Sequence, residues 1–147
     1  TVVGRGPDHH LWRQEVERLG ISERVTFIDW MPRDELLDYY AKNHAFLYPS
    51  MHDSGGLVVW EALSAGLPVI CLKCGGPSLI VTGQCGYAQE VAGQSYQEII
   101  DGLAKGLLRL QNPDQIAAWS HGARQRSDAM TWSSLVRSVY SDGSEES

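Results

Sequence analysis

Short apolar segments alternate with longer amphipathic segments along most of the chain. The short segments have the length and the apolar continuity of strands that are buried on both faces of a parallel sheet. Turn residues, mainly glycine and proline, separate them from the segments that follow. The pattern therefore predicts strands at residues 1–3, 25–28, 45–48 and 67–72. After the fourth strand the pattern is looser, with a short segment that ends near residue 88.

The longer segments carry apolar residues at helical spacing, with stop and start signals at their ends. Helices are expected over residues 11–19, 32–40, 56–65, 96–110 and 113–130, with a last helical stretch after Thr131. Strands that alternate with helices of this length form βαβ units with right-handed crossovers. The predicted fold is α/β, a three-layer Rossmann-like parallel sheet with helices on both faces. Residues 1–140 are assigned to one domain, and residues 141–147, which are small, polar and acidic, to a tail.

Ligands of such sheets bind at the carboxyl ends of the strands, in the loops that lead into helices. This rule selects four loops as candidate binding segments: residues 4–8, 29–33, 49–56 and 73–78. The chain also opens directly on the strand at Thr1, without any lead-in. We therefore expect it to be a piece of a longer protein that lacks the first strand of its sheet.

Composition and charge exclude several classes of function. The net charge of −6 argues against nucleic acid as a partner, because binding to phosphates depends on lysine and arginine. No apolar run reaches the roughly 18 residues that span a bilayer, so no transmembrane segment is expected. The three cysteines cannot all pair, which favours a reducing, cytoplasmic location, with peripheral membrane association of the full-length protein left open.

Cysteine, lysine and tryptophan residues elsewhere in the chain are further candidates for a site. Cys71 and Cys74 have the spacing of a metal or redox motif, but no histidine completes a zinc site and Cys71 is expected at the end of a buried strand. Lys73 follows the same strand and is interpreted as a solvated lysine. The tryptophans Trp12, Trp30, Trp119 and Trp132 are expected to pack in the core or between helices.

The segment from Asp53 to Glu61 carries the clearest candidate chemistry. Gly55 and Gly56 allow a ligand to approach the backbone, and the N–H groups at a helix start favour phosphate. A carboxylate on each side of such a phosphate site, able to accept hydrogen bonds from hydroxyl groups, suits a nucleotide sugar. On spacing alone, an alternative stays open, in which Asp53 caps the helix and Glu61 is solvated.

This acid pair, followed by Ala62-Leu63-Ser64-Ala65-Gly66-Leu67-Pro68-Val69-Ile70, resembles the signature of the group 1 (family 4) retaining glycosyltransferases of the GT-B fold. The resemblance covers nearly the whole chain, and its motifs occur in the family's order. It implies the C-terminal, donor-binding domain of that fold. The other matching segments are Val2-Val3-Gly4-Arg5-Gly6-Pro7, residues 25–32, residues 45–50, Gly75-Gly76-Pro77, Gly86-Tyr87, Trp132 and Tyr140.

The resemblance also implies roles for individual residues. Glu61 would bind the ribose hydroxyls of the donor nucleotide, and Asp53 would act in catalysis by holding hydroxyls of the transferred sugar near its anomeric carbon. Met31 would pack near the base. Backbone N–H groups for the diphosphate and sugar would come from Ser54, Gly55, Gly56, Leu57 and Val58, and the pyrophosphate side of the cleft would be lined by Gly4 and Gly6. The substrate would be a nucleoside-diphosphate sugar, with no metal and no cofactor.

The sequence departs from the family pattern at three places. Asp53 stands where glutamate is usual, Gly55 stands where phenylalanine is usual, and residues 78–81 lack the usual glutamate. The family's arginine and lysine that clamp the diphosphate, and its acceptor-binding domain, belong upstream of residue 1. Without that clamp, which stabilises the charge on the leaving group, we expect this piece to be inactive by itself. The acceptor, a saccharide or a lipid-linked molecule, would be bound by the N-terminal domain.

The function implied is therefore the donor-binding part of a hexosyltransferase. Two alternatives stay open at this point: the nucleotide lobe of a GT-B-shaped sugar-nucleotide epimerase, and a non-catalytic interaction domain with a decayed donor site. The identities of the donor and the acceptor, and the oligomeric state, are not determined by the sequence.

Overall fold

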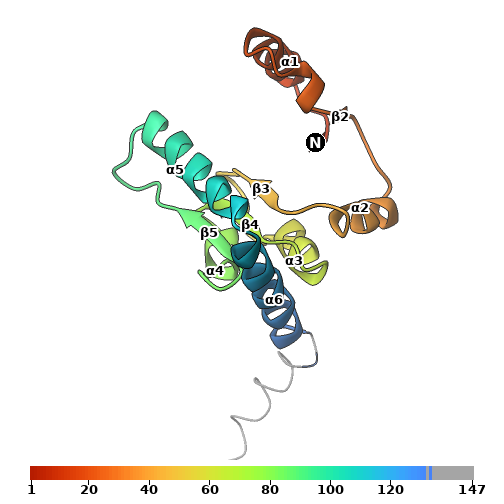
Figure 1. Cartoon of the computed structure of the whole chain (residues 1–147), viewed down its shortest axis with the longest axis vertical. Helices are drawn as coiled ribbons and strands as arrows, with labels where there is room; N and C mark the ends of the chain where they lie inside the picture. Colours follow the sequence, from red (N-terminus) through yellow and green to blue (C-terminus); the bar gives the residue numbers. More distant parts are fainter. Residues whose placement is uncertain (132, 134–147) are drawn as a thin grey trace, which may run out of the picture. The chain divides into compact units, whose positions relative to one another are not determined.

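The computed structural model describes residues 1–131 and 133 and divides the chain into two compact units, Thr1–Asp38 and Tyr39–Ser147. The predicted helical stretch after Thr131, the tail over 141–147, and Trp132 and Tyr140 lie outside the described residues. In chain order (Figure 1) the elements are β1 (Val2–Val3), α1 (His9–Arg18), the 3₁₀ turn η1 (Ser22–Arg24), β2 (Phe27–Ile28), α2 (Arg33–Tyr40), β3 (Phe46–Tyr48), α3 (Leu57–Ser64), β4 (Val69–Leu72), α4 (Pro77–Ile80), β5 (Gly86–Gln89), α5 (Tyr96–Leu108), the 3₁₀ turn η2 (Arg109–Gln111) and α6 (Pro113–Ala129).

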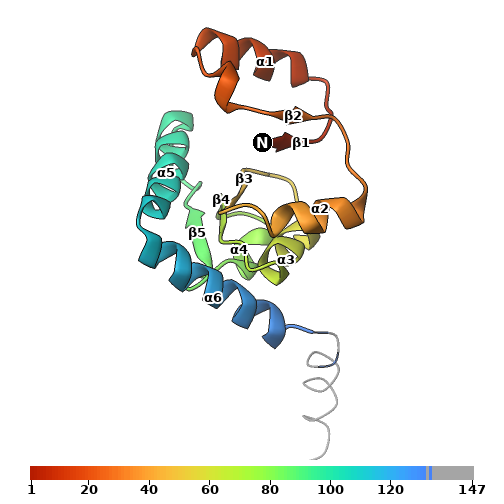
Figure 2. The same ribbon diagram turned by 45° about the vertical axis from the view of Figure 1, so that its right-hand side comes forward.

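The first unit is a β1–α1–β2 arrangement whose two strands run parallel and side by side (Figure 2). Val2 pairs with Phe27 and Val3 with Ile28, and the N–H of Gly4 extends the ladder with a hydrogen bond of 2.9 Å to the carbonyl of Ile28. No residue of this unit is fully buried. The strands bring the loops that follow them, residues 4–8 and 29–32, to the same end of the sheet.

The second unit contains a parallel sheet in the order β3–β4–β5. The central strand β4 is buried along its whole length, as its continuous run of apolar residues predicts. The register pairs Phe46 with Val69 and Val69 with Gly86, so the carboxyl ends of all three strands lie at one edge. This edge carries the loops over residues 49–56 and 73–76.

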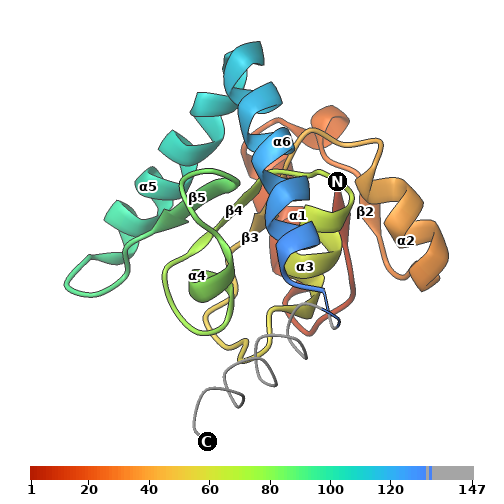
Figure 3. The same ribbon diagram turned by 90° about the horizontal axis from the view of Figure 1, so that it is seen from below.

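Helices cover both faces of this sheet. Helix α5 packs along β4 and β5, while α3 packs on β4 and against α6 (Figure 3). The core between these elements contains Val59 and Leu63 of α3 and Trp119 and Ala123 of α6, all nearly or completely buried. The indole N–H of Trp119 donates a hydrogen bond of 2.9 Å to the carbonyl of Gly83, which satisfies its polar group inside the core.

The predicted α/β class, with parallel strands and helices on both faces, is confirmed. The expected packing is confirmed for Trp119, but it is wrong for Trp12 and Trp30, which are 52% and 76% exposed. The single domain over residues 1–140 stays a prediction. None of the helices in the described part of the chain combines the length and the apolar character needed to cross a membrane.

Helix α4 has no counterpart among the predicted elements. It has only four residues, which is too short for a periodic pattern to appear. A local signal was present, because Pro77 occupies the first helical position, where proline is favoured. The far end of α4 depends on a distant residue: the Arg126 guanidinium donates hydrogen bonds of 3.1 and 3.0 Å to the carbonyls of Ile80 and Leu79.

Candidate functional site

The loop between β3 and α3 forms the first part of the candidate site. It begins at the carboxyl end of β3 and leads into the amino end of α3. Gly56 directly precedes the helix with φ of 60°, a left-handed conformation that favours glycine. The far end of the Ile80 side chain lies near where a Cβ atom on Gly56 would project, but that end can shift, so the backbone angle is what favours glycine here.

Asp53 accepts three hydrogen bonds, two from this loop and one from the end of β3. Its Oδ1 accepts from the N–H groups of Gly55, at 2.9 Å, and Gly56, at 2.8 Å. Its Oδ2 accepts from the Tyr48 hydroxyl at 2.9 Å. These contacts favour the charged carboxylate, so the Gly56 N–H, followed by the Tyr48 hydroxyl and the Gly55 N–H, lowers the pKa of Asp53 below its usual value.

The backbone N–H groups assigned to a ligand differ in their availability. Those of Gly55 and Gly56 are engaged by Asp53. Those of Leu57 and Val58, in the first turn of α3, donate no hydrogen bond to any residue that the structure describes. The first turn of a helix leaves such groups unpaired and carries the positive end of its dipole. Leu57 and Val58 are therefore the better candidates for binding an anion, and Ser54 is exposed beside them.

Glu61 lies one turn further along α3 and is partly buried. Its negative charge is close enough to the buried Tyr40 to contribute, after the larger effect of burial, to a raised pKa of the Tyr40 hydroxyl. Asp53 and Glu61 thus lie before and within the same short helix, and the amino end of that helix lies between them in the chain.

The loop after β4 supports the Asp53 loop through backbone contacts. The N–H of Gly76 donates a hydrogen bond of 2.8 Å to the carbonyl of Asp53. A Cβ atom on Gly76 would lie 2.6 Å from the Ser54 carbonyl oxygen, so only glycine allows this approach. The thiol of Cys74 also donates to the carbonyl of Ser50, at 3.6 Å. The two loops therefore form one connected surface at the carboxyl edge of the sheet.

The other predicted site residues lie in the first unit. Gly4, at the end of β1, and Met31, after β2, line a hollow of about 560 Å³, whereas Gly6 is exposed outside its lining. The volume is within the range of small-molecule sites. The remaining lining residues are Val3, Arg5, Asp29 and Trp30.

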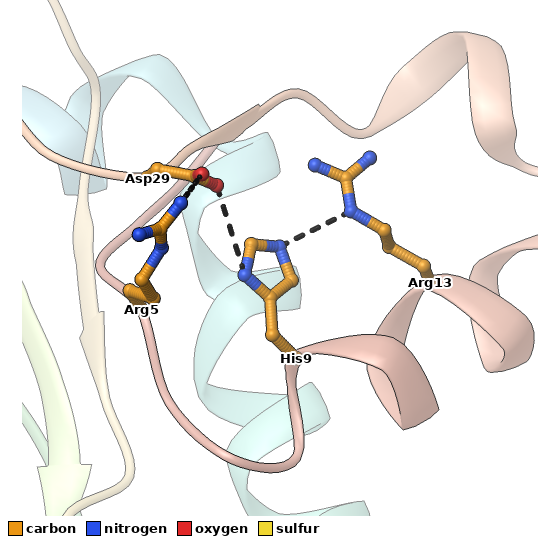
Figure 4. A network of polar contacts seen from close by, with 4 residues as sticks. All are labelled: Arg5, His9, Arg13 and Asp29. Atoms are coloured by element: carbon orange, nitrogen blue, oxygen red, sulfur yellow. Dashed lines mark hydrogen bonds and ion pairs between the residues drawn. The ribbon is translucent and has the colours of Figure 1, made fainter.

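Arg5 and Asp29 are not among the predicted site residues. The Arg5 guanidinium donates a hydrogen bond of 2.6 Å to Oδ2 of Asp29 (Figure 4). This contact, with a smaller attraction from His9, lowers the pKa of Asp29. His9 lies 3.8 Å from Oδ1 of Asp29 and accepts a hydrogen bond of 3.2 Å from Arg13. No sequence spacing signals this network, because it depends on the pairing of β1 with β2.

The expected burial of Cys71 in the fourth strand and the expected exposure of Lys73 are confirmed. Cys71 is fully buried, and burial raises the pKa of its thiol to about 12, which opposes any redox role. Lys73 is exposed and forms an ion pair with Glu90. No group of three potential metal ligands gathers within the described residues.

Comparisons with known proteins point to one family. A family model described as "Glycosyl transferases group 1" matches residues 1–126. D-inositol 3-phosphate glycosyltransferases are 32% identical to the chain over 124 residues in Corynebacterium urealyticum and 36% identical over 117 residues in Mycobacterium avium. These matches cover 84% and 79% of this chain but only 28% and 27% of the two relatives.

Solved structures resemble the chain over nearly its whole length. The pneumococcal O-GlcNAc transferase GtfA, in complex with UDP and GlcNAc, superposes with a TM-score of 0.79 at 19% identity, covering 95% of this chain and 28% of GtfA. WaaG, a glycosyltransferase of lipopolysaccharide biosynthesis, superposes with a TM-score of 0.73 at 23% identity, and the match covers 99% of this chain and 38% of WaaG. At this level of identity, the likeness shows the fold, which agrees with the predicted GT-B type.

Proposed function

Because this chain belongs to the family of glycosyl transferases group 1, we propose that it forms the donor-binding part of a retaining glycosyltransferase. The donor is a nucleoside-diphosphate sugar. In the reaction, the bond between the anomeric carbon and the diphosphate breaks, and the anomeric carbon bonds to an acceptor oxygen, which loses its proton. The chain spans about a quarter of its curated relatives, so the reaction itself is proposed for the whole protein.

The observation that carries this proposal is the arrangement around the amino end of α3. The N–H groups of Leu57 and Val58 have no partner among the described residues, and they lie at the positive end of the helix dipole. Acidic side chains stand on both sides of them in the chain, at Asp53 and Glu61. An anionic diphosphate suits the N–H groups, while hydroxyl groups of a sugar and a ribose suit the carboxylates.

The named relatives support the class of donor. GtfA, which shares the fold, was solved with UDP and GlcNAc, the two parts of a nucleoside-diphosphate sugar. The curated relatives are named as glycosyltransferases of D-inositol 3-phosphate. We propose the same class of donor for this chain, without assigning its base or its sugar.

Binding to free nucleotides tests this function without requiring turnover. The chain is titrated with UDP, GDP and ADP by isothermal calorimetry and by thermal unfolding. A nucleotide at about 100 times its dissociation constant should stabilise the chain by roughly 2.7 kcal/mol. Glu61→Ala should weaken binding of that nucleotide, whereas Glu17→Ala, which removes an exposed carboxylate from α1, should not.

A different result would reject the proposal. If no nucleotide binds at millimolar concentration, or if Glu61→Ala binds as the unaltered chain does, the donor site is not functional. The engagement of Gly55 and Gly56 by Asp53 would then support the alternative of an interaction domain with a decayed donor site.

A further inference from the structure

The hydroxyl of Tyr48 on β3 reaches the acidic loop and contacts Asp53 directly. The hydrogen bond to Oδ2 of Asp53 measures 2.9 Å, and it joins the end of the strand to the loop that follows it. Oδ1 of the same carboxylate is held by Gly55 and Gly56. Both oxygens of Asp53 are therefore fixed, one by the backbone and the other by a single side chain.

The acceptor capacity of the carboxylate shows what is left for a ligand. An ionised carboxylate has about four acceptor positions, two on each oxygen. Within the described residues, two hydrogen bonds reach Oδ1 and one reaches Oδ2. One acceptor position therefore remains, and it is on Oδ2, the oxygen that Tyr48 holds.

Aromatic stacking fixes the ring from which this hydroxyl extends. The ring of Tyr48 stacks on Phe46, with centroids 5.4 Å apart and planes inclined by 22°. Phe46 in turn meets the ring of Tyr40 edge-on, also at 5.4 Å. A tyrosine hydroxyl is protonated and able to donate at neutral pH, since its ordinary pKa is about 10. Burial, followed by the hydrogen bond to Asp53, raises the pKa of the Tyr48 hydroxyl further.

We propose that Tyr48 is a positioning residue that holds Asp53 with one acceptor position of Oδ2 open for a hydroxyl group of the transferred sugar. Tyr48 acts through Asp53 and does not touch the ligand. It favours a nucleotide that carries a sugar over the same nucleotide without one. The inference rests on the proposed donor site. It adds that Tyr48 determines how much the sugar contributes to the affinity of that site for its nucleotide.

The test compares each free nucleotide with its sugar-bearing form. The unaltered chain and Tyr48→Phe are titrated calorimetrically with UDP, GDP and ADP and with UDP-glucose, GDP-glucose and ADP-glucose. Tyr48→Phe keeps the stacked ring and removes only the hydroxyl. For the nucleotide that binds, the dissociation constants of the sugar-free form for Tyr48→Phe and for the unaltered chain should agree within about twofold. The glucose form should bind about tenfold more weakly to Tyr48→Phe than to the unaltered chain, because a charged acceptor loses the hydrogen bond that holds it in place.

Tyr87→Phe is the matched control. It removes a hydroxyl that donates a hydrogen bond of 2.7 Å to Gln89 on β5. The variant therefore measures the effect of losing a hydrogen-bonded tyrosine hydroxyl in the same sheet without a change at Asp53. This variant should bind both forms of the nucleotide unchanged. Asp53→Asn, measured alone and together with Tyr48→Phe, should show that the two changes are not additive, because both act on one contact.

A second measurement requires no ligand. Carbon-detected NMR should show that the pKa of the Asp53 carboxyl rises in Tyr48→Phe and stays unchanged in Tyr87→Phe. An unchanged Asp53 titration, or equal weakening of both nucleotide forms, overturns the role of Tyr48 while leaving nucleotide binding intact. Absence of binding by the unaltered chain rejects the proposed function and this inference together.

Discussion

The guanidinium of Arg5 and the carboxylate of Asp29 join the ends of the two parallel strands of the first unit through a hydrogen bond of 2.6 Å. The two residues are 24 positions apart in the chain, and the register of β1 and β2 brings them together. Since the contact favours the charged carboxylate, it lowers the pKa of Asp29 from its ordinary 3.8. Its contribution to stability is therefore complete above about pH 4 and is lost as the pH falls through the lowered pKa.

Arg5→Gln should return the pKa of Asp29 toward its ordinary value. The variant should also lose less of its unfolding free energy than the unaltered chain when the pH falls below about 4. NMR titration of the carboxyl carbon and urea denaturation at pH 7 and pH 3 measure the two effects. Arg18→Gln breaks an exposed ion pair with Glu15 of the same unit and should leave Asp29 unchanged. An equal Asp29 pKa in both variants would contradict the prediction.

Gly76→Ala should destabilise the chain by about 1–3 kcal/mol, because the added methyl group meets backbone that cannot move aside freely. The Cβ atom would lie 2.6 Å from the Ser54 carbonyl oxygen and 3.1 Å from the Gly55 nitrogen. Displacement of this loop should also weaken nucleotide binding. Chemical denaturation and calorimetry provide both measurements.

Gly83→Ala is the control for this substitution. No atom lies within 4 Å of a Cβ atom at that position, so its stability should change by no more than about 0.5 kcal/mol. Equal effects of the two alanines would show that the close approach of Gly76 does not matter.

The three cysteines should react in a fixed order. Cys74 is partly exposed, whereas Cys71 and Cys85 are buried, and the pKa of Cys71 is raised to about 12. Because the thiolate is the reactive form, iodoacetamide at pH 8 should modify Cys74 first and the other two only after unfolding. Mass spectrometry of peptides from native and urea-treated chain measures this order. Early modification of Cys71 would show that β4 is accessible to solvent and is not buried in the core.

Arg126→Lys should cost about 1 kcal/mol of unfolding free energy, because an ammonium group cannot reproduce the two hydrogen bonds of the guanidinium to α4. Hydrogen exchange should quicken at the N–H of Val81, which bonds to the carbonyl of Pro77 across α4. Arg124→Lys, on the same helix, keeps the charge as well and should not affect exchange at Val81. Equal exchange in both variants would argue against a bracing role for Arg126.

The strands of the sheet were predictable where the local sequence is continuously apolar. β4 is apolar at every position and follows Gly66 and Pro68, so its burial could be inferred before its neighbours were known. α4 was not predicted, because four residues are too few for a periodic pattern; Pro77 marks only its start, and the contact at its end comes from Arg126, which is 46 positions away from Ile80. Short elements of this kind depend on tertiary contacts rather than on local pattern.

The residues of the candidate site were selected from the sequence and stay a prediction, whereas their contacts could not be predicted. Sequence spacing left Asp53 either capping the backbone or binding a ligand, and the structure places its Oδ1 on the Gly55 and Gly56 N–H groups. The hydrogen bond between Tyr48 and Asp53 had no signal in the spacing, since only the end of β3 and the turn after it bring the hydroxyl to Asp53. Pairs such as these become visible only once the backbone path is known.

The backbone contact between Gly76 and the Asp53 loop has a consequence for redesign. The N–H of Gly76 and the carbonyl of Asp53 hold the two loops together without using the side chains that point outward from them. Those outward side chains can therefore be randomised while the scaffold of the site is retained. Ser54 in the first loop is exposed, and Leu57 and Leu79, in the helices that follow the two loops, are 74% and 78% exposed, so these three positions suit such a library.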